Sequence, residues 1–288
     1  MKIGSLCSGY GGLDLAVEAV FEAKTVWMCD VDKYANIAIE NNWNVPNLGD
    51  LKNVNWNNVE KIEILTAGYP CQPFSQAGQR KGINDKRHIW PHIKKIIGTL
   101  QPRWVILENV KGHLSLGYKE VLKDLTEIGY DTKWAIVRAS DVGAPHQRAR
   151  LFIVAYPNSH AYSQSRRITR SICKKGKKII YGSDREIIGC GCQIDCNTNN
   201  QQLPSNRKMQ KLGRRFDTRF EMSMRPIPNP LDDGKLNTKF VEYMMGLPRG
   251  WVTNLPITRA QQFKLLGNGV VAQQAEYAIK QLLEINCD

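Results

Sequence analysis

A cysteine in a tight turn is the strongest candidate for chemistry in this sequence. Cys71 belongs to the hexapeptide PCQPFS at residues 70–75, which follows an apolar run at 62–65. The run predicts a short buried strand, and Gly68 and Pro70 predict a sharp turn after it. Such a turn would place Cys71 at the carboxyl edge of a sheet, where open α/β sheets hold their ligands. Although most lone cysteines are small buried hydrophobes, a thiolate at this edge can act as a nucleophile.

Charged side chains flank two further predicted strands. Glu108 and Asn109 follow the apolar segment 102–107, and Arg148 and Arg150 precede the predicted strand 151–155. Because side chains alternate along an extended chain, we expect the two arginines to point toward the same face of the sheet. An acid at a strand end can be a cap, and two arginines can form surface ion pairs. Their coincidence with a candidate nucleophile favours a catalytic reading.

A glycine-rich turn near the N-terminus predicts a nucleotide-binding unit. The turn SGYGG at 8–12 lies between a strand expected at 2–7 and a helix expected at 13–23. Glycine lets a ligand approach the backbone closely, although a plain tight turn fits the same residues. Asp30 ends a second predicted strand about 20 residues after the turn, where an acid can hydrogen-bond a ribose. The turn differs from the G-x-G-x-x-G pattern of dinucleotide-binding proteins.

These motifs together resemble those of the DNA cytosine-5 methyltransferases. PCQPFS resembles the nucleophile motif of that family, and SGYGG resembles its S-adenosylmethionine loop. The ENV tripeptide at 108–110, the arginine pair and the stretch QQFKLLGNGV at 261–270 follow in the family order. The resemblance covers residues 1–155 and 236–285.

The resemblance implies an α/β fold, with a Rossmann-like S-adenosylmethionine-dependent methyltransferase domain and a small target-recognition domain. We expect the catalytic and cofactor-binding domain at 1–156 and the target-recognition domain at 157–240. The C-terminal segment, 241–288, would return to the catalytic domain as a helix reaching about Ile285.

The resemblance also implies the catalytic roles. Cys71 would add to carbon 6 of cytosine while Glu108 stabilises charge at ring nitrogen 3 and the amino group. One of the arginines, Arg148 or Arg150, would face the active site and help to polarise the pyrimidine carbonyl. The chain departs from the family at His146, where glutamine is common, so the role of glutamine is not transferred to His146.

S-adenosyl-L-methionine is the cofactor that the resemblance implies. Asp30 would hold its ribose hydroxyls and Asp50 would lie beside its adenine, although Asp50 could instead be a helix N-cap. Trp90 begins an amphipathic helix expected at 90–100. It stands where the family lines the adenine pocket, but it could equally belong to the core. The implied cofactor-binding residues are Ser8, Gly9, Tyr10, Gly11, Gly12, Leu13, Asp30, Val31, Asp50, Leu51, Pro70, Trp90, Asn268 and Gly269.

Residues 76–87 contain two glycines and many charges without an apolar period, which predicts a loop. Its place directly after Cys71 favours a lid over a bound base rather than an ordinary solvated loop. The expected substrate contacts in and around it are Gln72, Ser75, Arg80, Lys81, Arg87 and Asn109.

The charge distribution indicates a polyanionic partner. The 288 residues carry 40 Lys and Arg against 27 Asp and Glu, a net charge of +13. Residues 158–240 hold 17 basic and 7 acidic side chains, which is +10, and the remainder holds 23 and 20, which is +3. This basic segment fits a target-recognition region on double-stranded DNA, with a solvated basic surface as the alternative. The sequence does not identify the side chains that would read bases.

Cysteine spacing and hydropathy predict a cytoplasmic protein. The eight cysteines are not spaced like a disulfide scaffold, no signal peptide is expected, and no apolar run approaches the ~18 residues of a membrane span. Cys173, Cys190, Cys192 and Cys196 lack a paired C-x-x-C spacing, so we expect no metal. We expect a monomer that acts on DNA, with any cognate restriction endonuclease acting separately.

Three other functions compete with DNA methylation. Transfer RNA could be the methyl acceptor, although the long basic segment fits sequence-specific DNA better. A catalytically silent DNA-binding protein could share the fold, but Cys71, Glu108, Arg148 and Arg150 are all present. A nicotinamide oxidoreductase would suit Asp30 but not the glycine pattern. The sequence gives neither the recognition site nor the source organism.

Overall fold

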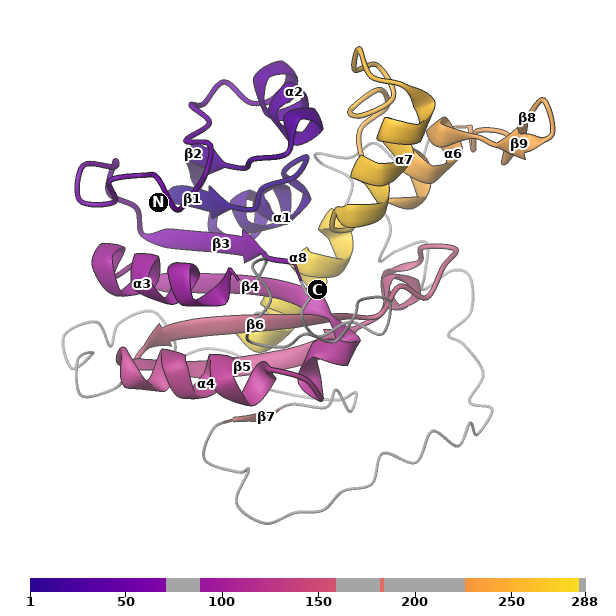
Figure 1. The fold of residues 1–288 in the computed structure, drawn as a ribbon. Coiled ribbons are helices and arrows are strands. Elements are labelled where there is room, and N and C mark those ends of the chain that lie inside the picture. The colour runs from indigo at the N-terminus through magenta and orange to yellow at the C-terminus, as the bar shows by residue number, and fades with distance from the viewer. Residues whose placement is uncertain (71–88, 159–181, 184–225, 285–288) are drawn as a thin grey trace, which may run out of the picture.

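The computed structural model describes residues 1–70, 89–158, 182–183 and 226–284. These residues form a mixed seven-stranded sheet in the order β2-β1-β3-β4-β6-β5-β7, drawn in Figure 1. Its strands β2, β1, β3 and β4 are parallel, and β6 is antiparallel to both β4 and β5. The strand bounds are β1 (Lys2–Leu6), β2 (Lys24–Cys29), β3 (Ile64–Gly68), β4 (Trp104–Val110), β5 (Tyr130–Val137), β6 (Arg150–Pro157) and β7 (Gly182–Ser183).

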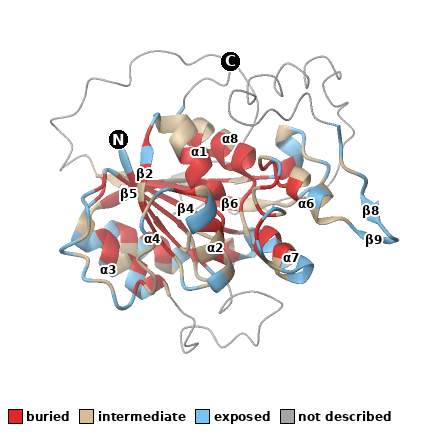
Figure 2. Ribbon diagram, turned by 90° about the horizontal axis from the view of Figure 1, so that it is seen from above, coloured by how far each residue is buried: buried red, intermediate tan, exposed pale blue. Residues whose placement is uncertain are grey.

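Helices cover both faces of the sheet, which confirms the predicted α/β class (Figures 1 and 2). One face packs against α1 and α8, and the other packs against α3 and α4. The α-helices are α1 (Gly12–Phe21), α2 (Lys33–Asn42), α3 (Trp90–Leu100), α4 (Tyr118–Glu127), α6 (Thr238–Met244), α7 (Arg259–Asn268) and α8 (Ala272–Leu282). Two 3₁₀ turns, η2 (Lys111–Leu114) and η3 (Ala139–Val142), and a hairpin of β8 (Leu231–Asp232) and β9 (Lys235–Leu236) complete the described elements.

Alternation along the central strands explains the two layers. Leu65 and Ala67 of β3 belong to the cluster under α3 and α4, whereas Ile64 belongs to the cluster under α1 and α8. A strand buried on both faces is expected to be largely apolar. β3 is apolar except for Thr66, whose buried hydroxyl donates to Asp14 Oδ1 at 2.6 Å. Central strands of this kind form a rigid base for the residues at their carboxyl ends.

The C-terminal helix α8 lies beside α1, although nearly the whole chain separates them in sequence. Ala275 and Ile279 of α8 share a buried cluster with Ala16 and Val17 of α1. A third cluster joins α2 to the region of α6 and α7. These contacts bring residues 269–271, between α7 and α8, against the glycine-rich turn before α1. None of the helices in the described part of the chain combines the length and the hydropathy that crossing a membrane requires.

Element bounds lie within a few residues of the sequence-based predictions, and two differences are informative. The helix predicted at 90–100 is α3, with the same bounds. The strand predicted to end before Glu108 continues to Val110, because β4 stays paired with β6 over Glu108–Phe152, Asn109–Leu151 and Val110–Arg150. The second difference concerns Arg148, which precedes β6 and is described below with the site.

A buried carboxylate organises the turn between α6 and α7. Glu242 is 2% exposed, and its Oε1 accepts hydrogen bonds from the backbone N–H groups of Val252 at 2.6 Å and Thr253 at 2.9 Å. Its Oε2 accepts from Gly250 N at 2.8 Å and from the Thr253 hydroxyl at 3.0 Å. One side chain therefore satisfies four donors of a turn that leads into α7.

Glu242→Gln is expected to lower the free energy of unfolding by about 2–4 kcal/mol, because the amide NH₂ would face buried donors. Urea unfolding monitored by circular dichroism measures this change. Glu40→Gln, on the exposed end of α2, is the matched control and should change stability by less than about 0.5 kcal/mol. Equal stability of the two variants would contradict this role for Glu242.

Candidate active site

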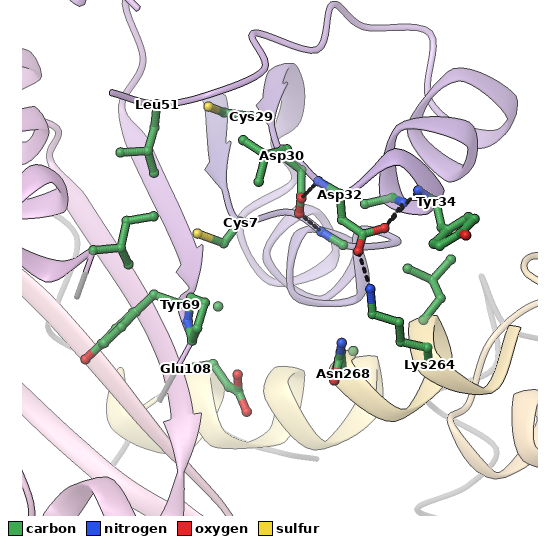
Figure 3. A pocket seen from close by; sticks show the side chains of 18 of the residues that line it. Cys7, Cys29, Asp30, Asp32, Tyr34, Leu51, Tyr69, Glu108, Lys264 and Asn268 are labelled. Carbon is green, nitrogen blue, oxygen red and sulfur yellow. Dashed lines mark hydrogen bonds and ion pairs between the residues drawn. The ribbon is translucent and has the colours of Figure 1, made fainter. Parts of the chain in front are cut away.

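The described residues enclose a cavity of about 470 Å³ at the carboxyl ends of the parallel strands. Each of these strands contributes to the wall through the residues at or just after its end (Figure 3). Helix α7 closes another side through its last turn. The wall includes Cys7 and Gly9 after β1, Cys29 and Asp30 at the end of β2, Gly68, Tyr69 and Pro70 from β3, Glu108, Asn109 and Val110 from β4, and Lys264, Asn268 and Gly269 from the region of α7.

Asp30 is fixed at the cavity wall by backbone donors. Its Oδ2 accepts a hydrogen bond from Gly9 N at 2.8 Å, and its Oδ1 accepts from Asp32 N at 2.9 Å. Burial raises the pKa of Asp30, and these two hydrogen bonds oppose that shift. Gly9 has φ 56° and open space where a Cβ would stand, so the turn leaves room for a ligand against its backbone.

The remainder of the glycine-rich turn faces the protein rather than the large cavity. Tyr10 is fully buried and its hydroxyl donates to the carbonyl of Val270 at 2.6 Å. A Cβ on Gly12 would lie 2.4 Å from the same carbonyl oxygen, so only glycine fits there. Ser8, Gly12 and Leu13 line a smaller adjoining cavity of about 30 Å³. This part of the turn therefore contacts Val270, in the stretch before α8.

Most of the other predicted cofactor residues meet at the large cavity. Val31, Asp50 and Leu51 line it together with Pro70, Asn268 and Gly269. Trp90 is buried instead beside the cavity wall, with its ring 5.5 Å from that of Tyr69 and its Nε1 donating to Asp124 Oδ2 at 2.7 Å. The described contacts of Trp90 are those of a core residue, and a contact with adenine stays a prediction.

Glu108 and Arg150 form a buried ion pair at the cavity. Arg150 Nε lies 3.0 Å from Glu108 Oε1, and Glu108 is 7% exposed. Burial raises the pKa of Glu108 to about 7, although Arg150 and Arg148 both favour its charged form. A carboxyl group poised near neutral pH can hold or release a proton during a reaction.

Arg148 has different partners from Arg150. Its Nη2 donates to the carbonyls of Gly267 at 2.8 Å and Gly269 at 2.6 Å, which holds the last turn of α7 near the site. Strand alternation does not orient Arg148 as predicted, because β6 begins at Arg150 and Arg148 has φ 33°. The charges of both arginines nevertheless act on Glu108. The catalytic role of Arg148 stays a prediction.

His146, where the chain departs from the family pattern, lies near both arginines. Burial and the charges of Arg148 and Arg150 lower the pKa of His146. Both of its ring nitrogens are buried, and neither has a hydrogen-bond partner in the described part of the chain. A neutral imidazole is therefore favoured at this position.

Several predicted residues lie outside the described ranges. The nucleophile candidate and five substrate candidates fall there: Cys71, Gln72, Ser75, Arg80, Lys81 and Arg87. So do Cys173, Cys190, Cys192 and Cys196, while the described residues contain no cluster of metal-ligating side chains. The neighbours of Cys71 are described: Pro70 lines the cavity, and Asn109 Nδ2 donates to the carbonyl of Tyr69 at 3.2 Å.

Sequence reasoning missed several side chains of the cavity wall, among them Cys7, Cys29, Tyr69 and Lys264. The first three stand at strand ends beside residues that were predicted, so their positions carried a usable signal. Lys264 joins the wall through a long-range ion pair of 2.7 Å with Asp32 at the start of α2. Nothing local in the sequence indicates that pairing.

Comparison with known proteins agrees with this geometry. Residues 1–188 match the model of the C-5 cytosine-specific DNA methylases. The chain is 28% identical over 300 residues to the type II methyltransferase M.BsuFI of Bacillus subtilis, with 92% of this chain and 68% of that protein covered. It is 27% identical over 309 residues to the type II methyltransferase M.MspI of Moraxella sp., with 97% and 71% covered.

Solved structures share the fold. The Entamoeba histolytica methyltransferase EhMeth superposes with a TM-score of 0.65 at 18% identity, over 99% of this chain and 98% of that one. That identity supports the architecture alone, whereas the family match covers more than half of the sequence. The chain belongs to the C-5 cytosine-specific DNA methylase family.

Proposed function

We propose that this chain transfers a methyl group from S-adenosyl-L-methionine to carbon 5 of a flipped cytosine in a specific short duplex DNA sequence. The observation that carries the proposal is the buried Glu108–Arg150 pair, which lines the same cavity as Pro70, the residue before Cys71. A carboxyl group with a pKa of about 7 and the residue that precedes the proposed nucleophile therefore line the same cavity. The type II relatives support DNA as the substrate.

The cavity suits the proposed cofactor in size and in donor set. Its volume of about 470 Å³ falls in the range of small-molecule sites. Asp30 and Asp50 provide acceptors for hydroxyl and amino groups, and the open Gly9 backbone permits close approach. Asn268 and Gly269 would close the site from the side of α7. When bound, S-adenosylmethionine supplies an electrophilic methyl group.

Asp30→Ala is expected to weaken S-adenosylhomocysteine binding by about 10–100-fold, because it removes a hydrogen-bonding group oriented by Gly9 and Asp32. Isothermal titration calorimetry measures this change. Lys235→Ala, on the exposed hairpin, serves as the control and should bind like the wild type. Unchanged affinity in Asp30→Ala would remove Asp30 from the cofactor site.

The chemistry begins with covalent catalysis. Carbon 5 of cytosine is a weak nucleophile until a group adds to carbon 6. The Cys71 thiolate would form a bond to carbon 6, and the ring electrons would shift toward carbon 5 and ring nitrogen 3. Covalent addition divides one difficult step into easier ones.

Glu108 would stabilise the charge that this addition creates. In its protonated form it would hydrogen-bond ring nitrogen 3 and give it the proton as the ring electrons shift there, and its raised pKa keeps that form accessible near neutral pH. Arg150 holds Oε1 of the carboxyl group and so fixes its orientation. A preorganised donor in a water-poor site is an effective stabiliser of developing charge.

The reaction is completed on the substrate. Carbon 5 would take the methyl group as the bond from methyl to sulfur breaks and S-adenosylhomocysteine leaves. A base would then remove the carbon-5 proton, the double bond between carbons 5 and 6 would re-form as the Cys71 thiolate is expelled, and ring nitrogen 3 would return its proton to Glu108. The cytosine has to leave the duplex first, which requires a few kcal/mol that protein contacts offset. We assign those contacts to a target-recognition domain at 157–240, between a catalytic domain at 1–156 and a returning segment at 241–288.

Competition between substrates tests the proposal. The protein is incubated with methyl-tritiated S-adenosylmethionine and unmethylated duplex DNA, in the presence of increasing transfer RNA, and the label in each polymer is counted. The proposal predicts that the label enters DNA. It also predicts that the enzyme acts as a monomer and needs no endonuclease for this transfer. Label in transfer RNA alone would favour the RNA alternative, and cofactor binding without transfer would favour a silent DNA-binding protein.

A further inference from the structure

Tyr69 occupies a central place in the structure that the proposed mechanism does not use. It follows β3 directly, stands two residues before Cys71, and is 5% exposed. It lines the large cavity and also a small one of about 10 Å³. A buried hydroxyl at this position needs a partner, and the identity of that partner is informative.

The partner is a histidine that follows Glu108 closely in sequence. Tyr69 Oη and His113 Nε2 are 2.9 Å apart, in a buried hydrogen bond between side chains. The two rings also meet edge to face, with centroids 5.6 Å apart and planes at 83°. His113 lies in η2, which continues directly from β4 and therefore from Glu108. This hydrogen bond links the segment that precedes Cys71 to the segment that follows Glu108.

Tyr69 also contacts Trp90, the first residue of α3. Its ring centroid lies 5.5 Å from that of Trp90, at the start of α3. Trp90 is itself tied to α4, because its Nε1 donates to Asp124 at 2.7 Å. The end of β3 and the start of α3 therefore meet at one buried aromatic cluster.

We propose that Tyr69 and His113 are positioning residues for methyl transfer: their hydrogen bond sets where the chain enters the Cys71 segment relative to Glu108. The inference rests on the proposed function. The physical reason for a positioning role is that a small shift of a nucleophile away from its reacting geometry lowers the reaction rate strongly. Although Tyr69 lines the cavity, its hydroxyl is engaged with His113, so we expect its removal to leave cofactor binding near wild type.

The first test uses variants that remove the bond while keeping volume. Tyr69→Phe and His113→Leu are each expected to lower the single-turnover rate of methyl transfer to duplex DNA by about 3–10-fold. The affinity for S-adenosylhomocysteine should stay within about twofold. His113→Gln, which can still bond the Tyr69 hydroxyl, should restore most of the rate, and the Tyr69→Phe/His113→Leu double variant should be no slower than either single variant.

The matched control is Tyr130→Phe. Tyr130 is also buried and its hydroxyl donates to the Pro102 carbonyl at 2.6 Å, away from the cavity. A purely structural role for the Tyr69 hydroxyl would lower the stability of both Phe variants and leave both rates unchanged. Wild-type rates in Tyr69→Phe, or additive losses in the double variant, would overturn the proposal.

A second measurement does not depend on the substrate. Alkylation of Cys71 by iodoacetamide is followed by mass spectrometry in each variant, with S-adenosylhomocysteine present. Because the hydrogen bond would set the position of the chain that enters the Cys71 segment, we expect the alkylation rate to change by at least about threefold in Tyr69→Phe and His113→Leu, and to stay near wild type in His113→Gln and Tyr130→Phe. An unchanged rate in the first two overturns the positioning role even if DNA is not the substrate. The predicted alkylation rates in the variants, together with wild-type protein that methylates no DNA, would reject the proposed function alone.

Discussion

Cys71→Ser is expected to reduce methyl transfer to duplex DNA by at least about 10³-fold while cofactor binding stays near wild type. A thiol has a pKa near 8.5 and yields thiolate at neutral pH, whereas a serine hydroxyl does not ionise in this range. The substitution changes one atom, so it tests the nucleophile rather than the fold. Single-turnover transfer from tritiated S-adenosylmethionine measures the rate, and calorimetry with S-adenosylhomocysteine measures cofactor binding.

Another cysteine provides the control for this variant. Cys287 is the last cysteine of the chain, and Cys287→Ser should methylate at the wild-type rate. Loss of activity in Cys71→Ser together with loss of cofactor affinity would indicate a damaged site instead of a missing nucleophile. Undiminished activity in Cys71→Ser would refute covalent catalysis by this residue.

Glu108→Gln is expected to reduce methyl transfer by about 10²–10⁴-fold, the usual contribution of a positioned acid. The amide carbonyl can still accept from Arg150, so the ion-pair geometry is largely retained. The amide NH₂ can donate a hydrogen bond but cannot give up a proton to ring nitrogen 3. The rate constant at saturating cofactor should fall while the affinity for S-adenosylhomocysteine changes little. A rate within threefold of wild type would remove Glu108 from the chemistry.

The same substitution is expected to stabilise the fold above neutral pH. The pKa of Glu108 rises from 4.5 to about 7 because the carboxyl is buried, so ionisation in the folded state is unfavourable. The stability associated with the protonated group is fully present below pH 4.5 and is lost as the pH rises to about 7. Glutamine lacks this titration, so the advantage of the variant should grow over that window to on the order of 2 kcal/mol.

Urea unfolding at pH 5 and pH 8 measures this difference. Glu40→Gln should show no gain that depends on pH, because its side chain is exposed. A stability of Glu108→Gln that is equal to or below wild type at pH 8 would contradict a buried, unfavourably ionised carboxyl. Lower activity together with higher stability in this variant would indicate that Glu108 is retained for function at a cost in stability.

The parts of the structure that depend on local pattern could be predicted from the sequence. Continuous apolar runs predicted the central strands, since parallel strands are buried on both faces. The period of 3.6 residues predicted α3 with its bounds. Because strand ends meet at one edge of such a sheet, the sequence also placed Gly9, Asp30 and Glu108 at a common cavity, as observed.

The parts that depend on long-range register could not be predicted. Arg150 meets Glu108 because β6 pairs antiparallel with β4, with Arg150 opposite Val110, and no local pattern specifies that register. Arg148 takes a positive φ, which is uncommon for a residue other than glycine, and its partners are carbonyls about 120 residues away in sequence. The bond between Tyr69 and His113 likewise depends on the packing of two strand ends.

The most direct test of the central claim is a map of 5-methylcytosine. The protein is incubated with S-adenosylmethionine and unmethylated bacterial genomic DNA, and the modified base is located at single-base resolution. The account predicts 5-methylcytosine confined to one short sequence, present with the wild type and absent with Cys71→Ser. DNA that stays unmodified although S-adenosylhomocysteine binds tightly would contradict it.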